Sequence, residues 1–316
     1  MSKSETAADY LEERNEVHAR SGSDAARKIR ERVIESAMFL CAVFSVAITV
    51  GIVWVLVYES WHFFENVSLI DFLTDTQWTV LFENPRYGIM PLVTGTLVTS
   101  AIALIVALPL GTTIAIYLSE YASSTVREIL KPVLELLSAV PTVVFGYFAL
   151  LFVTPLLQKI LPDLPGFNML SAGIVIGIMI VPYVSSLSED AMKAVPVTIR
   201  EGSYAMGATR VQTAIRVLIP AAFSGIASAY VLGFSRAVGE TMVVAIAAGT
   251  QPNLTLNPME GAATITAYIV QVSLGDLPHG SVAYQSIFAA GLTLMVMTLI
   301  FNIGGYFLRK RFREIY

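Results

Sequence analysis

One continuous stretch, half polar and half apolar, decides how the rest of this sequence is understood. Residues 200–220 read REGSYAMGATRVQTAIRVLIP, and residues 221–249 read AAFSGIASAYVLGFSRAVGETMVVAIAAG. The first half has helix-forming spacing and ends at Pro220. The second half is an apolar block long enough to cross a bilayer, yet it carries Arg236 and Glu240. A charge in hydrocarbon costs at least ~2.5–3.5 kcal/mol on insertion scales, so two ionisable groups there indicate a function.

The composition is that of an integral membrane protein. Of the 316 residues 55% are hydrophobic and 14% are charged, whereas soluble domains carry about 25% charged residues. A membrane-spanning helix needs ~20 apolar residues, and six blocks qualify: Ile34–Tyr58, Met90–Leu118, Val133–Leu157, Leu170–Leu187, Ala221–Ala248 and Ser286–Leu308. We therefore predict an all-α integral membrane protein with six transmembrane helices.

The distribution of Lys and Arg predicts the orientation. Basic residues precede the first block at 27–32 and follow the last block at 309–313, and they also occur in the connection 188–220. Because such residues accumulate on the cytoplasmic side, we expect both termini inside. The predicted parts are a cytoplasmic N-terminal tail (1–33), a transmembrane domain (34–308) with an inner loop at about 188–220, and a cytoplasmic C-terminal tail (309–316).

The connections expected on the outer side are rich in aromatic or apolar residues. Trp61, Phe63, Phe64, Phe72 and Trp78 lie between the first two blocks, and we expect them to form an aromatic belt on the membrane surface. The later segment Gly261–Leu274 is apolar but too short to span. We expect it to be a re-entrant or surface-lying helix.

Prolines are expected to interrupt two of the blocks. Pro141 lacks a backbone donor and predicts a kink or break in the third block, next to Thr142. A helix broken at mid-membrane is a place where a substrate meets free backbone groups, and a simple packing kink is an equal alternative. Pro182 is expected to interrupt the fourth block in the same way.

The polar half of the opening stretch resembles the "EAA" loop of ABC-importer membrane subunits. The resemblance rests on Glu201, on Gly207 six residues later and on the VLIP sequence that ends at Pro220, while Gly202 and Ser203 replace two alanines of the pattern. In that family the loop forms a short coupling helix that fits a cleft on the ATPase subunit. The resemblance implies that Glu201, Gly207, Ala208 and Pro220 couple this chain to an ATPase.

The apolar half resembles the phosphate-specific (Pst-type) permeases. SRAVGETM at 235–242 is similar to their RAxGET segment, and the Met after the Thr is more like their C subunit than its A partner. The sequence LVTGTLVTS at 92–100 and the region of Pro141 add to the resemblance, which covers about residues 30–313. It implies a type I (MetI-like) importer fold in a bacterial or archaeal plasma membrane.

The resemblance also implies partners and a substrate path. The partners are a second permease subunit of the PstA type, two copies of an ATP-binding subunit of the PstB type and an external phosphate-binding protein of the PstS type. The path residues are Arg236, Glu240, Thr241, Pro141 and Thr142. Arg236 and Glu240 are four residues apart and are expected on one helix face, where Glu240 pairs with Arg236 until phosphate takes its place. A purely structural ion pair is the alternative.

Small residues repeat every four positions along the fifth block, at Gly225, Ala229, Gly233 and Ala237. Small side chains at this spacing allow two helices to approach closely. We expect this stripe to pack against another span or against a second permease subunit.

Several motifs are absent from the sequence. It has no GxxxxGK[ST] phosphate loop and no Cys/His cluster with metal-ligand spacing. We therefore expect a transporter subunit, not an enzyme, with no cofactor, no metal and no nucleic-acid partner, driven by ATP hydrolysis on another chain. Two alternatives stay open: a permease for another oxyanion, such as sulfate or molybdate, and a gradient-driven carrier.

Overall fold

The computed structural model describes residues 4–80, 82, 84–275, 277, 278 and 280–311, with side chains described from residue 27 onward except for residue 29. The chain divides into two compact units, residues 1–56 and residues 57–316. The first unit is most of a single helix, α1 (Ser4–Asn66), whose part from Arg30 onward is long and apolar enough to cross a membrane. The tail predicted at 1–33 is therefore, from Ser4, continuous with the helix of the first span.

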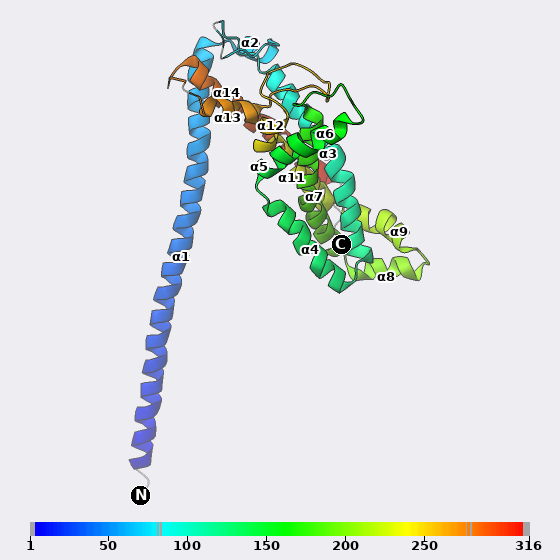
Figure 1. Ribbon diagram of the computed structural model, residues 1–316. Helices are drawn as coiled ribbons and strands as arrows, with labels where there is room; N and C mark the ends of the chain where they lie inside the picture. The colour runs from blue at the N-terminus through cyan, green and yellow to red at the C-terminus, as the bar shows by residue number, and fades with distance from the viewer. Residues whose placement is uncertain (1–3, 81, 83, 276, 279, 312–316) are drawn as a thin grey trace. The chain divides into compact units, whose positions relative to one another are not determined.

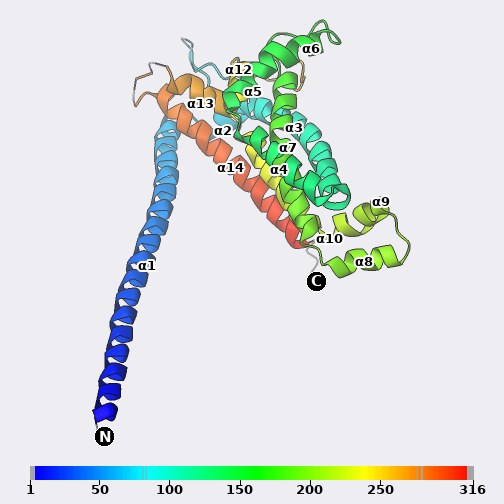
Figure 2. The same cartoon turned by 60° about the horizontal axis from the view of Figure 1, so that its bottom comes forward.

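The second unit is a helical bundle around α3 and α7. Its helices are α2 (Leu69–Thr74), α3 (Met90–Ile116), α4 (Ser124–Ala139), α5 (Thr142–Phe148), α6 (Thr154–Gln158), α7 (Met169–Lys193), α8 (Val197–Ala205), α9 (Arg210–Thr213), α10 (Ile219–Ala221), α11 (Phe223–Val238), α12 (Met242–Ala247), α13 (Ile265–Ser273) and α14 (Val282–Arg311). Single π-helical turns, η1 (Tyr117–Tyr121), η2 (Ala149–Val153) and η3 (Ala214–Leu218), join consecutive helices. Figures 1 and 2 show α6 at one end of α3 and α7 and the pair α8–α9 at the other.

The number of spans agrees with the prediction only if two bent pairs of helices each count as one. Four described helices are long and apolar enough to cross a membrane, and the pairs Ser124–Ala139 with Thr142–Gln158 and Arg210–Ala221 with Phe223–Val238 bend by 86° and 76°. The third block is therefore broken at Pro141, as its sequence predicts. The fourth block is not interrupted, because α7 continues through Pro182.

Glycines and alanines bring α7 close to both of its main neighbours. A Cβ at Gly177 would lie 2.7 Å from the Ala103 carbonyl of α3, and one at Gly225 would lie 2.4 Å from Ala191 of α7. Ala229 and Ala237 are buried. The stripe predicted on the fifth block thus packs against a span of the same chain, which is one of its two expected outcomes.

The aromatic residues before α3 do not form the predicted surface belt. Phe63, Phe72 and Trp78 are almost fully buried and make edge-to-face contacts in one cluster that also holds Tyr268 of α13. Their mutual burial outweighs an interfacial position because each ring removes a large apolar area from water. Of the two tryptophans expected in the belt, only Trp61 stays well exposed, at 69%.

The segment that was too short to span forms α13, which packs against α14 and α3. Its start is fixed by α3, because the Thr96 hydroxyl accepts a hydrogen bond of 3.0 Å from the Ile265 amide. Gly95 makes room for this contact, since a Cβ there would lie 2.3 Å from the Ala263 carbonyl. α13 is therefore a mostly buried helix, packed inside the bundle at the same end as α6.

Candidate translocation path and ATPase-coupling site

The predicted fifth span is interrupted between Val238 and Met242. α11 ends at Val238 with Gly239 as its C-cap, and α12 begins at Met242. The expectation of one continuous helix over Ala221–Ala248 is wrong. A helix start leaves backbone N–H groups without intrahelical acceptors, so the interruption creates a polar place inside an apolar segment.

Glu240 occupies this interruption and caps α12. Its side chain is buried, and its Oε1 accepts hydrogen bonds from the amides of Met242 (3.2 Å) and Val243 (3.3 Å). A carboxylate at a helix N-terminus is stabilised by these donors and by the helix dipole. The backbone carbonyl of Glu240 also accepts from the Thr266 hydroxyl at 2.6 Å, which ties the interruption to α13.

Arg236 lies on α11 and faces α7, not Glu240. Its Cζ is 4.8 Å from the ring centre of Tyr183, and its Nε is buried without a hydrogen-bond partner in the described part of the chain. None of the ion pairs among the described residues includes Arg236. The predicted pairing of Arg236 with Glu240 is therefore wrong, because the helix breaks at Gly239 and the carboxylate is used as a cap.

The other predicted path residues lie at the starts of two short helices, α5 and α12. Thr241 precedes α12 and donates to the Gly239 carbonyl at 3.2 Å, and Pro141 is the N-cap of α5, which begins at Thr142. α5 and α12 are in contact at Gly146, where a Cβ would lie 2.8 Å from Ile246. The structure thus brings two interrupted helices side by side, although no hydrogen bond of the described residues joins Pro141 or Thr142 to Arg236 or Glu240.

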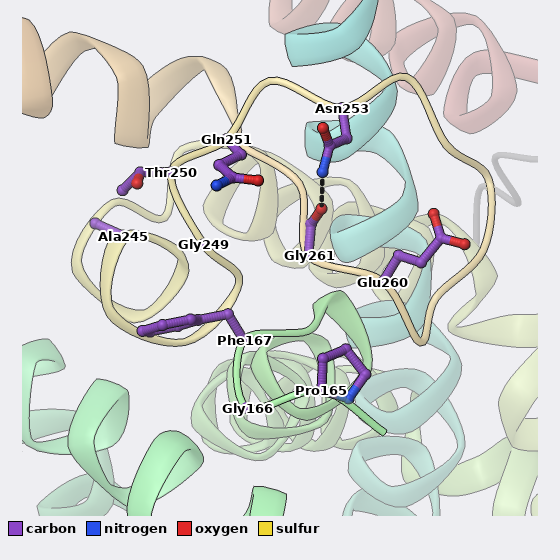
Figure 3. A pocket seen from close by; sticks show the side chains of 10 residues that line it. All are labelled: Pro165, Gly166, Phe167, Ala245, Gly249, Thr250, Gln251, Asn253, Glu260 and Gly261. Carbon is purple, nitrogen blue, oxygen red and sulfur yellow. Dashed lines mark hydrogen bonds between the residues drawn. The ribbon is translucent and has the colours of Figure 1, made fainter. Parts of the chain in front are cut away.

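A hollow of about 600 Å³ lies at the other end of α12, between the loop that precedes α7 and the loop that precedes α13. Figure 3 shows Pro165 and Phe167 on one side and the segment around Gly249 and Gln251 on the other. Backbone hydrogen bonds tie the two loops together, such as the one from the Met169 amide to the Glu260 carbonyl at 3.0 Å. Within the loop that precedes α13, the Asn253 side-chain amide donates to the Gly261 carbonyl at 3.1 Å. The hollow reaches Ala245 of α12, which is about 4.5 Å along the helix from Met242 at the Glu240 end.

The carboxylate of Glu260 borders this hollow and is held by its own loop. The Asn257 side-chain amide donates to it at 3.0 Å. Hydrogen bonds from Thr255 and then Asn257 lower the pKa of Glu260 below its ordinary value. The side chain therefore stays ionised at neutral pH.

The predicted coupling segment folds as a helical hairpin of α8 and α9. Gly207 supplies the turn, with φ of +82°, a conformation that favours glycine. Thr209 and Gln212 form a capping box at the start of α9, and the Ser203 and Thr213 hydroxyls are 2.9 Å apart across the hairpin. The predicted residues Glu201, Gly207 and Pro220 are exposed, and Ala208 is half-buried.

Glu120, in the turn η1 that continues α3, holds this hairpin in place. Its side chain is only 2% exposed and forms an ion pair of 3.1 Å with Arg200 of α8. The same carboxylate accepts from the Tyr204 hydroxyl at 3.1 Å, and its backbone carbonyl accepts from Arg210 at 3.5 Å. Burial, followed by the bond to Glu120, raises the pKa of Tyr204.

A second buried carboxylate, Glu189, joins α7 to α4 at the same end. Its side chain is fully buried and forms ion pairs with Arg127 (3.5 Å), Lys131 (3.0 Å) and Lys193. A buried charge needs such partners. The sequence analysis did not identify Glu120, Glu189 or Tyr183 as functional, and no motif points to them. Their partners are distant in the sequence: Lys131 is 58 residues from Glu189, and Tyr204 is 84 residues from Glu120.

The hairpin presents apolar side chains to solvent. Val197, Met206 and Val211 are all more than half exposed, as is Ile215 in the following turn η3. Exposed apolar groups that gather on a polar segment are typical of a protein interface. The geometry is therefore that of a membrane bundle with an exposed helical hairpin fixed to its core by a buried carboxylate.

Comparison with known proteins places this architecture in a family. Residues 107–314 match the family described as binding-protein-dependent transport system inner membrane component. The probable ABC transporter permease protein YqgH of Bacillus subtilis is 36% identical over 90% of this chain and 91% of that protein. The phosphate transport system permease protein PstC of Mesorhizobium japonicum is 31% identical over 92% and 94%, and PstC 1 of Mycobacterium tuberculosis is 36% identical over 69% and 71%.

Solved structures agree on the fold. A bacterial alginate ABC transporter in complex with its alginate-bound periplasmic protein matches with a TM-score of 0.63 at 18% identity, over 90% of this chain and 96% of that one. An inward-facing MetNI methionine ABC transporter matches with a TM-score of 0.53 at 17% identity, over 72% and 94%. The predicted MetI-like all-α fold is confirmed.

The chain belongs to the family of binding-protein-dependent transport system inner membrane components. It is the multi-pass inner-membrane permease subunit of an ABC importer, in which the ATPase is a separate chain and a partner permease and a binding protein complete the system. The expectation of a transporter subunit driven by another chain is confirmed, and the gradient-driven carrier is set aside.

Proposed function

We propose that this permease subunit imports inorganic phosphate. The observation that carries the proposal is the similarity, over nearly its whole length, to a permease named for phosphate transport. It is supported by Arg236, a cationic side chain in an apolar helix that has no carboxylate partner among the described residues. Arg stays charged, and its fork of donors fits the oxygens of phosphate.

In this proposal Arg236 binds the passing anion and Tyr183 positions it. The guanidinium rests on the Tyr183 ring, a contact that holds a cation without neutralising it. Glu240 keeps α11 and α12 apart by capping α12, so its charge is satisfied locally and does not compete with the anion for Arg236. Thr241, Pro141 and Thr142 lie at the interrupted helices beside this path, and the hollow at Gly249 and Gln251 is its outer entrance.

The hairpin α8–α9 is the proposed contact with the ATPase. Glu201, Gly207, Ala208 and Pro220 shape it, and Glu120 transmits its movement to α3.

The partners are two ATPase copies of the PstB type, a permease of the PstA type and a phosphate-binding protein of the PstS type. Both termini lie in the cytoplasm of a bacterium or archaeon, with tails at 1–33 and 309–316 around the permease domain 34–308.

Uptake competition tests the substrate. Vesicles containing the complete importer are loaded with ATP and given labelled phosphate with an excess of unlabelled phosphate, sulfate or molybdate. The proposal predicts that only unlabelled phosphate suppresses the signal. Suppression by sulfate or molybdate instead assigns the path to another oxyanion.

A further inference from the structure

A cationic hollow lies between α11 and α14, away from the proposed path. It measures about 570 Å³ and is lined by Ser224, Gly225, Ser228, Tyr306, Arg309 and Lys310. It combines two cations with three hydroxyl groups. This set of donors fits a phosphate group, and the permease function described above uses none of these side chains.

The hollow is built by local contacts that fix its most buried cation. Arg309 is half-buried, and its Nη1 donates to the Ser228 hydroxyl at 3.2 Å, while its Nε lies 3.4 Å from the Gly305 carbonyl. Gly305 lets α14 approach α11 closely, because a Cβ there would lie 2.4 Å from Val231. The two helices therefore hold the guanidinium in a preformed position.

Neither cation of the hollow is neutralised within the described part of the chain. No ion pair among those residues includes Arg309 or Lys310. Arg127, Lys131, Lys193 and Arg200, at the same end of the bundle, all pair with carboxylates. The positive charge of the hollow is therefore available to an external anion.

The position of the hollow along α14 indicates which anion this is. α14 is apolar enough to cross a membrane and ends in Arg309, Lys310 and Arg311. The residues just before these cations, Tyr306, Phe307 and Leu308, are all exposed at 46–62%. Exposed aromatic and apolar groups followed by cations are typical of the boundary between hydrocarbon and headgroups, so an occupant of this hollow has its charge at headgroup depth.

We propose that this hollow binds the headgroup of an anionic phospholipid. The phosphate contacts Arg309 and Lys310, and the Ser224 and Tyr306 hydroxyls donate to its oxygens. Ser228 holds Arg309 in place, and the acyl chains lie along the exposed face at Phe307 and Leu308. Basic pockets between membrane helices bind lipid headgroups in this way. The proposal requires only that the end of α14 lies at a membrane surface, so it stands apart from the identity of the transported anion.

The test compares lipids retained by the purified importer. The complex is reconstituted in mixed phosphatidylglycerol and phosphatidylcholine nanodiscs, extracted with mild detergent, and its bound lipids are measured by mass spectrometry. The unmodified chain is expected to retain phosphatidylglycerol. Lys310→Gln, at an exposed position, should weaken retention by about fivefold, and Arg309→Gln with Lys310→Gln should weaken it further.

Arg311→Gln is the matched control, because it removes the same charge from the same helical turn outside the hollow. Equal losses in Arg311→Gln and Lys310→Gln would mean general charge attraction and would overturn the site. Displacement of the lipid by excess inorganic phosphate would assign the hollow to a free anion. Unchanged lipid together with loss of the co-purifying ATPase in the double variant would assign it to that subunit.

Discussion

Glu120 and Arg200 form an ion pair of 3.1 Å that joins η1, which continues α3, to the α8–α9 hairpin. The carboxylate is almost fully buried, and Tyr204 and Arg210 of the hairpin bind to the same residue. This arrangement gives the hairpin a rigid connection to a helix of the membrane bundle. It is the structural basis on which we expect ATPase movement to reach the permease.

We predict that Glu120→Gln uncouples transport from ATP hydrolysis. The change removes the charge that pairs with Arg200, and loss of a hydrogen-bonded charged partner costs about 1.5–3 kcal/mol. Phosphate transported per ATP hydrolysed, measured in vesicles, should fall. Tyr204→Phe is the milder comparison, since it removes one hydrogen bond and leaves the ion pair; a larger defect in Tyr204→Phe than in Glu120→Gln would argue against this connection.

A pair of glycines in the hairpin gives a prediction on stability. A Cβ would meet no atom within 4 Å at Gly202 or at Gly207, but only Gly207 has a positive φ. Gly207→Ala should therefore destabilise the hairpin by about 1–2 kcal/mol. Gly202→Ala, inside α8, should stabilise it by up to about 1 kcal/mol. Hydrogen exchange of the hairpin amides measures both, and equal effects of the two changes would contradict the turn assignment.

Charge reversal at Glu201 tests the docking surface itself. Glu201 is exposed on α8 and forms no ion pair among the described residues, so Glu201→Lys should leave the fold intact. We expect it to weaken ATPase binding or to uncouple hydrolysis from uptake. A Glu201→Lys complex with normal ATPase content and normal coupling would remove this residue from the interface.

The sequence predicted those breaks and turns that depend on the type of a single residue. The break at Pro141 follows from a missing backbone donor, and the turn at Gly207 follows from residue type. The relation of Arg236 to Glu240 could not be predicted, because four-residue spacing places two groups on one face only while the helix continues. Here the helix stops at Gly239, and α12 uses the carboxylate as a cap.

The anchors of the hairpin escaped prediction for a different reason. Glu120 and Glu189 stand in charged, loop-like sequence, and their burial depends on cations supplied by distant helices. The aromatic cluster around Phe63 shows the same effect, since its burial is produced by α13, which is about 200 residues later. In all three cases the burial results from tertiary packing, which residue spacing in the sequence does not predict.

The outer loop gives a prediction on pH. Hydrogen bonds from Thr255 and Asn257 hold the pKa of Glu260 below its ordinary value of 4.5. A depressed pKa means that the contribution to stability is present above 4.5 and is lost as pH falls through the folded-state value. Asn257→Ala should raise the pKa of Glu260, measured by the pH dependence of loop proteolysis, and an unshifted midpoint would contradict this assignment.

Tyr183 tests how Arg236 is positioned. Tyr183→Phe keeps the aromatic face beneath the guanidinium and should preserve uptake, whereas Tyr183→Leu removes it. Because a cation–π contact is worth about 0.5–2 kcal/mol, uptake by Tyr183→Leu should fall by roughly twofold to thirtyfold. Equal uptake by the two variants would show that the ring face does not position Arg236.

Labelled phosphate uptake by an Arg236→Gln importer is the most direct test of the central claim that this guanidinium serves the transported anion. The variant should assemble with its ATPase in normal amount, because Arg236 is remote from the hairpin in sequence and forms no described contact with it. Uptake should fall to the background of vesicles without ATP. Normal phosphate uptake by this assembled variant would show that Arg236 does not serve the transported anion.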